Sequence, residues 1–187
     1  MVATRKWTVE EVAAAPPEGL WELIDGEIVP VTPAGAESAM AVGAVTVLVG
    51  GHVFAHRLGA VFGSEAGYRP HPERDTVRAP DFSFIRADRM AFIRDRRQFI
   101  SIPPDFAVEV LSPSDSRSSA FAKCVWWLEA GVPVVWLVDP QRRLVTVWTP
   151  DDAPRTLRDG ETLDGGAVLP GLSVDVSAIF GDAPPAP

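Results

Sequence analysis

Cysteine is nearly absent from this chain: Cys124 is the single one in 187 residues. One thiol excludes an internal disulfide framework and is typical of a reducing compartment. We find no apolar run that would predict a membrane-spanning helix, and the first residues lack the apolar core of a signal peptide. We therefore expect a cytoplasmic protein without a membrane segment, in which Cys124 is a structural thiol.

Positive charge is also scarce, since the formal net charge is -8. This balance argues against a protein that grips nucleic acid with its whole surface. The charge is uneven, however, because arginines outnumber acids in residues 69–97. Such a stretch can contact a phosphate backbone, or it can be a solvated loop with internal ion pairs, and the sequence leaves both open.

The chain shows no internal repeat and no linker that would divide it. We therefore predict one domain over residues 1–182, followed by a disordered proline-rich tail at 183–187. Asp25-Gly26 supplies the positive φ angles of a tight turn, which predicts a β-hairpin over residues 21–29.

Residues 36–58 combine two conflicting signals. Their apolar side chains follow helical spacing, but several valines favour strand and Gly50-Gly51 weakens a helix. We predict a helix. A second helix is clearer, because it has cap residues at 114–116 and Gly131 beyond its end. Strands are predicted around 60–69, 79–86, 105–111, 134–138 and 144–148. This order indicates an α/β fold with a mixed sheet flanked by helices.

Two carboxylates lie in otherwise apolar strands. Glu109 interrupts the strand at 105–111, where an ionised carboxylate is costly unless it is paired or bound to metal. Asp81 begins the strand directly after Pro80. Carboxylates on neighbouring strands could hold one Mg²⁺ ion, whereas each alone could equally be a strand-initiating Asp or a Glu in a structural ion pair.

Lys123 lies in a helix that is apolar almost all round. Such a helix is buried or lies at an interface, and a lysine inside it needs an anionic partner. Glu109 is the nearest candidate along the chain, and the alternative is a lysine that extends to the surface.

The ordered set Pro80-Asp81, Glu109 and Lys123 resembles the PD-(D/E)xK nuclease superfamily. More closely, the chain is similar to the Uma family of bacterial restriction endonuclease-like proteins. The stretches that carry the likeness span most of residues 20–148, and are 22–27, 78–84, 108–114, 130–133 and 136–140. Together they are specific, whereas any one alone would be weak.

The resemblance implies a restriction endonuclease-like fold and a role for each matching residue. Asp81 and Glu109 would bind Mg²⁺ or Mn²⁺ together with the backbone carbonyl of Val110. Lys123 would act on the attacking water or the developing charge, and Glu37 matches an acidic position that contacts metal through water.

Two departures from the family pattern bear on the helices. Ser38 stands where a histidine is common, and Trp127 stands where a tyrosine is usual. These departures put the helix contacts and the role of Glu37 in doubt, but not that of the central triad.

Three further side chains attract attention. His52 and His56 could share a helical face, yet they do not follow the zinc-protease pattern, so a surface pair is expected. Glu65 is expected to be a strand-end charge rather than a neighbour of the metal.

The sequence therefore predicts a metal-dependent endonuclease that hydrolyses DNA, with the arginines of residues 86–97 on the phosphate backbone. The alternative is a catalytically silent binding or regulatory module that keeps the fold, which the negative net charge favours. Large apolar side chains crowd residues 120–130 and 134–138, so we also predict a homodimer.

Overall fold

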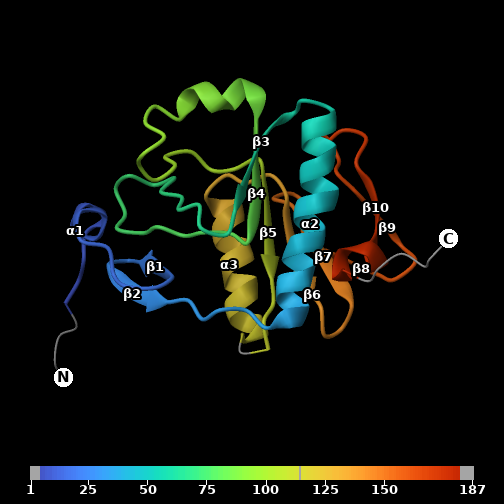
Figure 1. The fold of residues 1–187 in the computed structure, drawn as a ribbon, viewed down its shortest axis with the longest axis horizontal. Helices are drawn as coiled ribbons and strands as arrows, with labels where there is room; N and C mark the ends of the chain where they lie inside the picture. Colours follow the sequence, from blue (N-terminus) through green and yellow to red (C-terminus); the bar gives the residue numbers. More distant parts are fainter. Residues whose placement is uncertain (1–4, 114, 182–187) are drawn as a thin grey trace.

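A six-stranded mixed sheet lies at the centre of the computed structural model, which describes residues 5–113 and 115–181 (Figure 1). Neighbouring strands are antiparallel except for the parallel pair β5 and β6. In spatial order the strands are β3 (Gly59–Gly63), β4 (Phe82–Arg86), β5 (Phe106–Val110), β6 (Val135–Asp139), β7 (Leu144–Trp148) and β8 (Arg155–Arg158). Ser114 and the tail predicted at 183–187 lie outside the described residues.

One helix covers each face of this sheet. Because β5 and β6 are parallel, the chain must cross over between them, and α3 (Arg117–Glu129) forms the crossover. The other face is covered by α2 (Ala36–Ala55), so residues 36–58 are mainly helical, as predicted. Phe106 and Val108 pack in the α2 cluster, whereas Ala107 packs in the α3 cluster, as strand alternation requires.

The N-terminal segment forms a separate unit beside the sheet. The predicted hairpin is present as β1 (Trp21–Ile24) and β2 (Glu27–Pro30), with Asp25 at φ 47° and Gly26 at φ 80° in its turn. Leu23 exchanges two backbone hydrogen bonds with Val77, and α1 (Val9–Ala14) packs on the same small cluster. This pairing holds the hairpin against the loop that leads into β4.

The C-terminal elements, which the sequence did not predict, extend the core on the α2 side. They are β9 (Thr162–Asp164), β10 (Ser173–Asp175) and the short 3₁₀ helix η2 (Val176–Phe180), while η1 (Ala87–Phe92) follows β4. Leu163, Leu169 and Ile179 are fully buried there.

Two predicted strands are shorter than expected. β3 ends at Gly63 rather than at residue 69, because the chain turns there and Tyr68 forms isolated bridges with Arg78 and Ile100 instead. β4 starts at Phe82 rather than at residue 79, since Pro80 has no N–H for the ladder.

α2 corrects one expectation from the sequence. Its length and composition would allow it to cross a membrane, so the expectation that no such stretch exists was wrong. The sequence did not indicate such a long apolar helix, because its valines favour strand and its glycines weaken a helix. About a third of its most apolar window, 33%, is buried inside the structure, which is the sheet-facing side of the helix.

The apolar crowding at residues 120–130 and 134–138 is largely absorbed within one chain. β6 is buried throughout. In α3, Cys124 and Trp127 are fully buried, whereas Phe121 and Val125 stay exposed. This region therefore offers little exposed apolar surface for a dimer. Homodimerisation stays a prediction that needs another surface.

Candidate active site

Asp81 and Glu109 lie opposite each other at one end of the β4–β5 pair. Phe82 pairs with Val108, and the next step of the same antiparallel register places Asp81 across from Glu109. The Asp81 carboxylate also accepts a 2.7 Å hydrogen bond from the Val110 N–H. The Asp81 side chain thus takes the place of a strand partner where Pro80 ends the ladder.

Lys123 points from α3 into the same end of the sheet. Its ammonium lies 2.9 Å from Glu109 Oε2 and 3.0 Å from Glu22 Oε1, and it donates to the Ala79 carbonyl at 3.1 Å. All three N–H groups of the ammonium therefore have an acceptor. The structure brings Lys123 together with both predicted carboxylates, and the lysine does not extend to the surface.

Glu109 is held on both of its oxygens. Oε2 faces Lys123, while Oε1 accepts a 2.6 Å hydrogen bond from the Trp127 indole N–H. The pKa of Glu109 is raised from 4.5 to about 8, mainly by burial and also by nearby Asp81 and Glu22, against the opposing effect of Lys123. Trp127, the departure from the usual tyrosine, thus contacts the site directly.

Negative charge exceeds positive charge in this buried cluster. Burial also raises the pKa of Asp81, although Lys123 and the Val110 N–H oppose it. For Lys123, burial alone would lower the pKa, but Glu109, Glu22 and Asp81 outweigh it and raise the pKa above its usual value. Lys123 is therefore a stable cation, and the carboxylates around it favour uptake of a proton or another cation.

Glu22 is the site residue that the sequence analysis missed. It is 7% exposed, accepts a 3.1 Å hydrogen bond from the Ala79 N–H and lies 3.9 Å from Arg78. It reaches Lys123 because the hairpin is docked on the loop before β4. A signal was present, since Glu22 is an acid within the first stretch that resembles the family.

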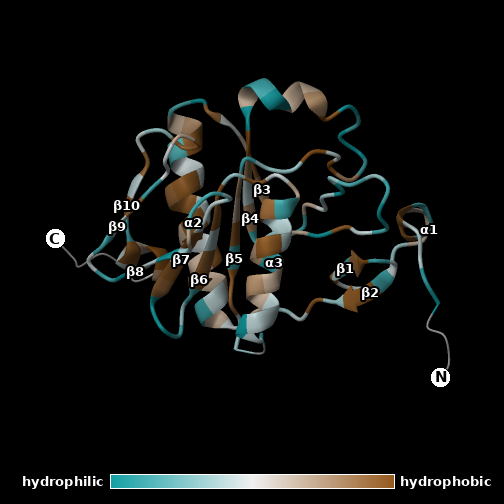
Figure 2. Cartoon of the chain, turned by 180° about the vertical axis from the view of Figure 1, so that it is seen from behind, coloured by the Kyte–Doolittle hydropathy of each residue, from teal (hydrophilic) through white to brown (hydrophobic). Residues whose placement is uncertain are grey.

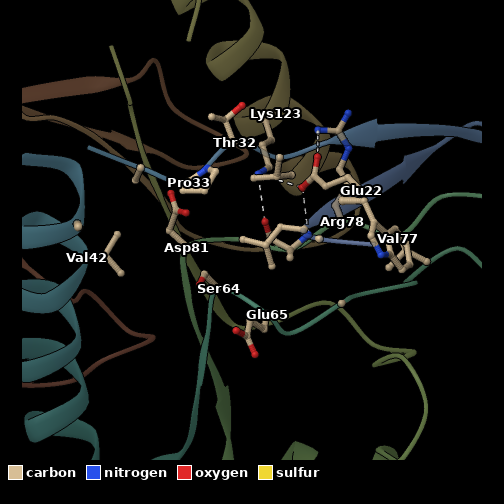
Figure 3. Close-up of a pocket in the computed structure, with 18 of the residues that line it drawn as sticks. Glu22, Thr32, Pro33, Val42, Ser64, Glu65, Val77, Arg78, Asp81 and Lys123 are labelled. Atoms are coloured by element: carbon tan, nitrogen blue, oxygen red, sulfur yellow. Dashed lines mark hydrogen bonds and ion pairs between the residues drawn. The ribbon is translucent and has the colours of Figure 1, made fainter. Parts of the chain in front are cut away.

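A cleft of about 640 Å³ opens between the hairpin, α2 and the sheet (Figure 3). Glu22, Asp81 and Lys123 line it together, and Ser64 and Glu65 line it just beyond the end of β3. An adjoining cavity of about 460 Å³ shares Glu22, Asp81 and Lys123 and adds Glu109. Glu65 therefore lines the same cleft as the candidate site residues, which a strand-end charge need not do.

Other candidates lie away from this cluster. Glu37 is exposed in the first turn of α2 and does not line the cleft, whereas the buried Ser38 hydroxyl donates to the Leu111 carbonyl at 2.8 Å. His52 Nε2 contacts the Pro170 carbonyl at 3.0 Å, and His56 contacts the His52 carbonyl. These imidazoles serve local structure.

Cys124 lies one residue beyond Lys123 but has a different environment. It is fully buried in the α3 cluster, and burial raises the pKa of its thiol to about 12. A thiol with a raised pKa is a poor nucleophile, as expected of a structural cysteine.

The arginine-rich stretch is largely tied up in ion pairs. Arg89 lies 2.9 Å from Asp105, and Arg86 lies 2.7 Å from Asp88. Further pairs in the stretch join Arg69 to Glu10, Arg78 to Glu22 and Arg97 to Asp95. Of the arginines in residues 69–97, Arg74, Arg94 and Arg96 form no ion pair with the described residues, so they are the ones in this stretch left for an outside partner.

Among the described residues, no group of three or more His, Cys, Asp or Glu side chains could hold a metal ion. A site on Asp81 and Glu109 would therefore be a two-carboxylate site. That donor set fits Mg²⁺, which binds through one or two carboxylates and keeps several waters. The excess negative charge of the cluster fits a cation as well.

A mixed sheet between two helices, with an N-terminal hairpin and two carboxylates on adjacent strands, places the protein in the restriction endonuclease-like class. The chain belongs to the Uma2 family, described as "Putative restriction endonuclease", whose model matches residues 9–177. No curated protein matches the chain. Among solved structures, it is similar to a nuclease of DUF820 from Anabaena variabilis, itself described as putative. The two are 20% identical, with a TM-score of 0.77 over 92% of this chain and 97% of that one.

Proposed function

We propose that this protein is a metal-dependent endonuclease that hydrolyses phosphodiester bonds in DNA. The observation that carries the proposal is the convergence of Asp81, Glu109 and Lys123 on one cleft. Membership of the Uma2 family supports a nuclease, and the particular residues supply the chemistry.

Asp81, Glu109 and the Val110 carbonyl would hold Mg²⁺ or Mn²⁺. The bound ion would polarise the scissile phosphate and lower the pKa of a water molecule. The Val110 N–H keeps the Asp81 carboxylate oriented, and the Trp127 indole does the same for Glu109. Both carboxylates are thus pre-positioned by neighbouring hydrogen-bond donors.

Lys123 has a separate role in this proposal. Its raised pKa keeps it charged, so it serves as a fixed cation beside the reacting phosphate rather than as a base. A fixed cation stabilises the negative charge that develops in the transition state. Glu22 and the Ala79 carbonyl hold the ammonium in place, which makes Glu22 a positioning residue.

Plasmid cleavage tests this function. We expect the purified protein to nick or linearise DNA at low salt with Mg²⁺ or Mn²⁺, and not with EDTA. Asp81→Asn is expected to lower the rate roughly a hundredfold or more, because the amide keeps the shape but loses the anionic ligand. Glu37→Gln is the matched control, since Glu37 is exposed outside the cleft. Equal cleavage by wild type and Asp81→Asn would refute the mechanism.

A catalytically silent binding module is the second candidate. The ion-paired arginines and the net charge of -8 favour it, because little free positive charge remains for DNA. Metal binding separates the two candidates: a nuclease needs the ion on Asp81 and Glu109, whereas a silent module does not.

The pH dependence of metal binding gives a further prediction. Glu109 has a pKa of about 8, so below that pH a proton must leave before a cation binds. The apparent affinity for Mn²⁺ should therefore rise roughly tenfold per pH unit below pH 8 and level off above it. Calorimetry from pH 6 to pH 9 measures this slope. Glu37→Gln should keep the slope, and a flat profile in wild type would show that Glu109 is not a ligand.

A further inference from the structure

The outer face of α2 carries a stripe of apolar and small residues that residues 5–113 and 115–181 leave largely exposed. Met40 is 50% exposed, Val47 72% and Phe54 67%. Gly43 and Gly51 lie between them and are exposed too. In Figure 1, α2 lies in front of the sheet with no element over it, and Figure 2 colours it mainly in the apolar part of the scale. We call these five residues the α2 stripe.

The α2 stripe follows the period of the helix. Its spacing is three, four, four and three residues, which keeps all five positions on one side of an α-helix. At 1.5 Å per residue, the stripe from Met40 to Phe54 is roughly 21 Å long. No Asp, Glu, Lys or Arg lies between Glu37 and Arg57, so a charged partner would find no carboxylate, ammonium or guanidinium there to pair with.

Packing against the described residues does not require the glycines of the stripe. A Cβ atom added at Gly43 or at Gly51 would meet nothing within 4 Å. Glycine inside a helix costs about 1 kcal/mol relative to alanine. A residue without a side chain at these two positions does allow another helix to approach closely.

The α2 stripe is symmetric about Val47. Met40 and Phe54 lie seven residues before and after it, and Gly43 and Gly51 lie four residues before and after it. An antiparallel copy of α2 would therefore place the large Met40 beside the partner's large Phe54 and glycine beside glycine. This self-complementarity is what a two-fold interface requires.

We propose that α2 is the two-fold interface of a homodimer, with a second copy of this chain covering the α2 stripe. The two helices run antiparallel and the axis passes beside Val47. Glu37 lies in the first turn of α2 and Arg57 lies just beyond its last turn, so in an antiparallel pair each Glu37 lies at the same end as the other copy's Arg57. Neither forms an ion pair within the part of the chain that the structure describes. Opposite charges at both ends favour the antiparallel arrangement.

The exposed apolar residues of α3 fit a second copy less well. Phe121 already contacts Trp148 at 5.3 Å between ring centroids and Arg117 at 5.7 Å. Its exposure is 36%, half that of Val47. The α2 interface does not depend on nuclease activity, so its test is independent of the proposed function.

Val47→Glu tests the interface, with Thr46→Glu as its matched control. In the dimer, Val47→Glu brings two like charges together at the axis, whereas in a monomer Val47 is exposed and tolerates the change. Thr46 is exposed next to Val47 but points about 100° away around the helix. In sedimentation at 50 μM, wild type and Thr46→Glu should be dimers and Val47→Glu a monomer, with equal thermal stability in the monomeric state.

Cross-linking gives a second measurement. Cys124 is buried, so Val47→Cys adds the accessible thiol. Oxidation should join two Val47→Cys chains at least tenfold faster than two Thr46→Cys chains. Gly51→Leu, which improves the helix and blocks close approach, should also give a monomer. Three results would each overturn the proposal. They are a wild-type monomer at 50 μM, a Val47→Glu dimer, and a wild-type monomer that sediments with phosphatidylglycerol vesicles and loses this binding in Val47→Glu.

Discussion

Replacing Lys123 by methionine is expected to lower DNA cleavage roughly a hundredfold or more while Mn²⁺ binding is kept or tightened. Methionine fills the space of the lysine stem but has no charge. Because the Lys123 ammonium lies 2.9 Å from Glu109 and 3.0 Å from Glu22, its loss leaves more negative charge around the cation site. A lost ligand weakens metal binding, whereas a lost neighbouring cation strengthens it, so the two roles give opposite signs.

Lys6→Met is the matched control for that experiment. Lys6 is the only other lysine in the chain, and it pairs with Glu27 at 2.9 Å on the exposed side of the same hairpin. It should cleave like wild type. Thermal unfolding must accompany the assay, because Lys123→Met leaves buried carboxylates without their cation and is destabilising above pH 8. Cleavage by folded Lys123→Met at the wild-type rate contradicts the proposed role.

Local patterns were sufficient to predict that Asp81, Glu109 and Lys123 lie close together, whereas their roles were implied by the family resemblance. Asp81 and Glu109 were predicted on neighbouring strands, and the antiparallel register of β4 and β5 brings them opposite each other. Lys123 was identifiable because it is the one basic residue in the apolar stretch 120–130, which forms most of the helix after β5. Each inference needed elements that are neighbours in the sequence.

Glu22 could not be found in this way. Its place beside Lys123 depends on the pairing of Leu23 with Val77, which joins segments more than fifty residues apart. Strand alternation says which face of the hairpin Glu22 occupies, but not what that face meets. A different limit hid β8, β9 and β10, because short strands with few apolar residues give a weak periodic signal.

α2 shows how a correct element can still be misjudged. Helical spacing identified the helix, but apolar residues lie on both the buried and the exposed side of it, and periodicity did not separate the two sides. Val45, Val49 and Val53 pack on the sheet, whereas Val47 and Phe54 point outward. The apolar excess suspected at residues 120–130 lies on α2 instead, and only the packed structure reveals which face is covered.

Glu109→Gln is expected to stabilise the fold at high pH while abolishing metal-dependent cleavage. The pKa of Glu109 rises from 4.5 in the unfolded chain to about 8 in the folded state. The folded state therefore holds a proton that the unfolded chain releases in this window, and wild-type stability falls as pH rises from about 4.5 to about 8. Glutamine carries no titrating proton and avoids this loss, and its amide oxygen can still accept from the Trp127 indole.

The expected gain for Glu109→Gln is on the order of a few kcal/mol at pH 9 and close to zero at pH 5, since one pKa unit corresponds to about 1.4 kcal/mol. For a chain of this size that is a rise of roughly 2–4 °C in Tm per kcal/mol. Cleavage should fall roughly a hundredfold or more because the variant lacks an anionic ligand. Glu37→Gln, an exposed change of the same kind, should alter neither quantity. If Glu109→Gln is less stable than wild type at pH 9, the ion pair with Lys123 outweighs the penalty of burying the Glu109 charge. Glu109 would then be one half of a structural ion pair rather than a carboxylate kept for binding a cation.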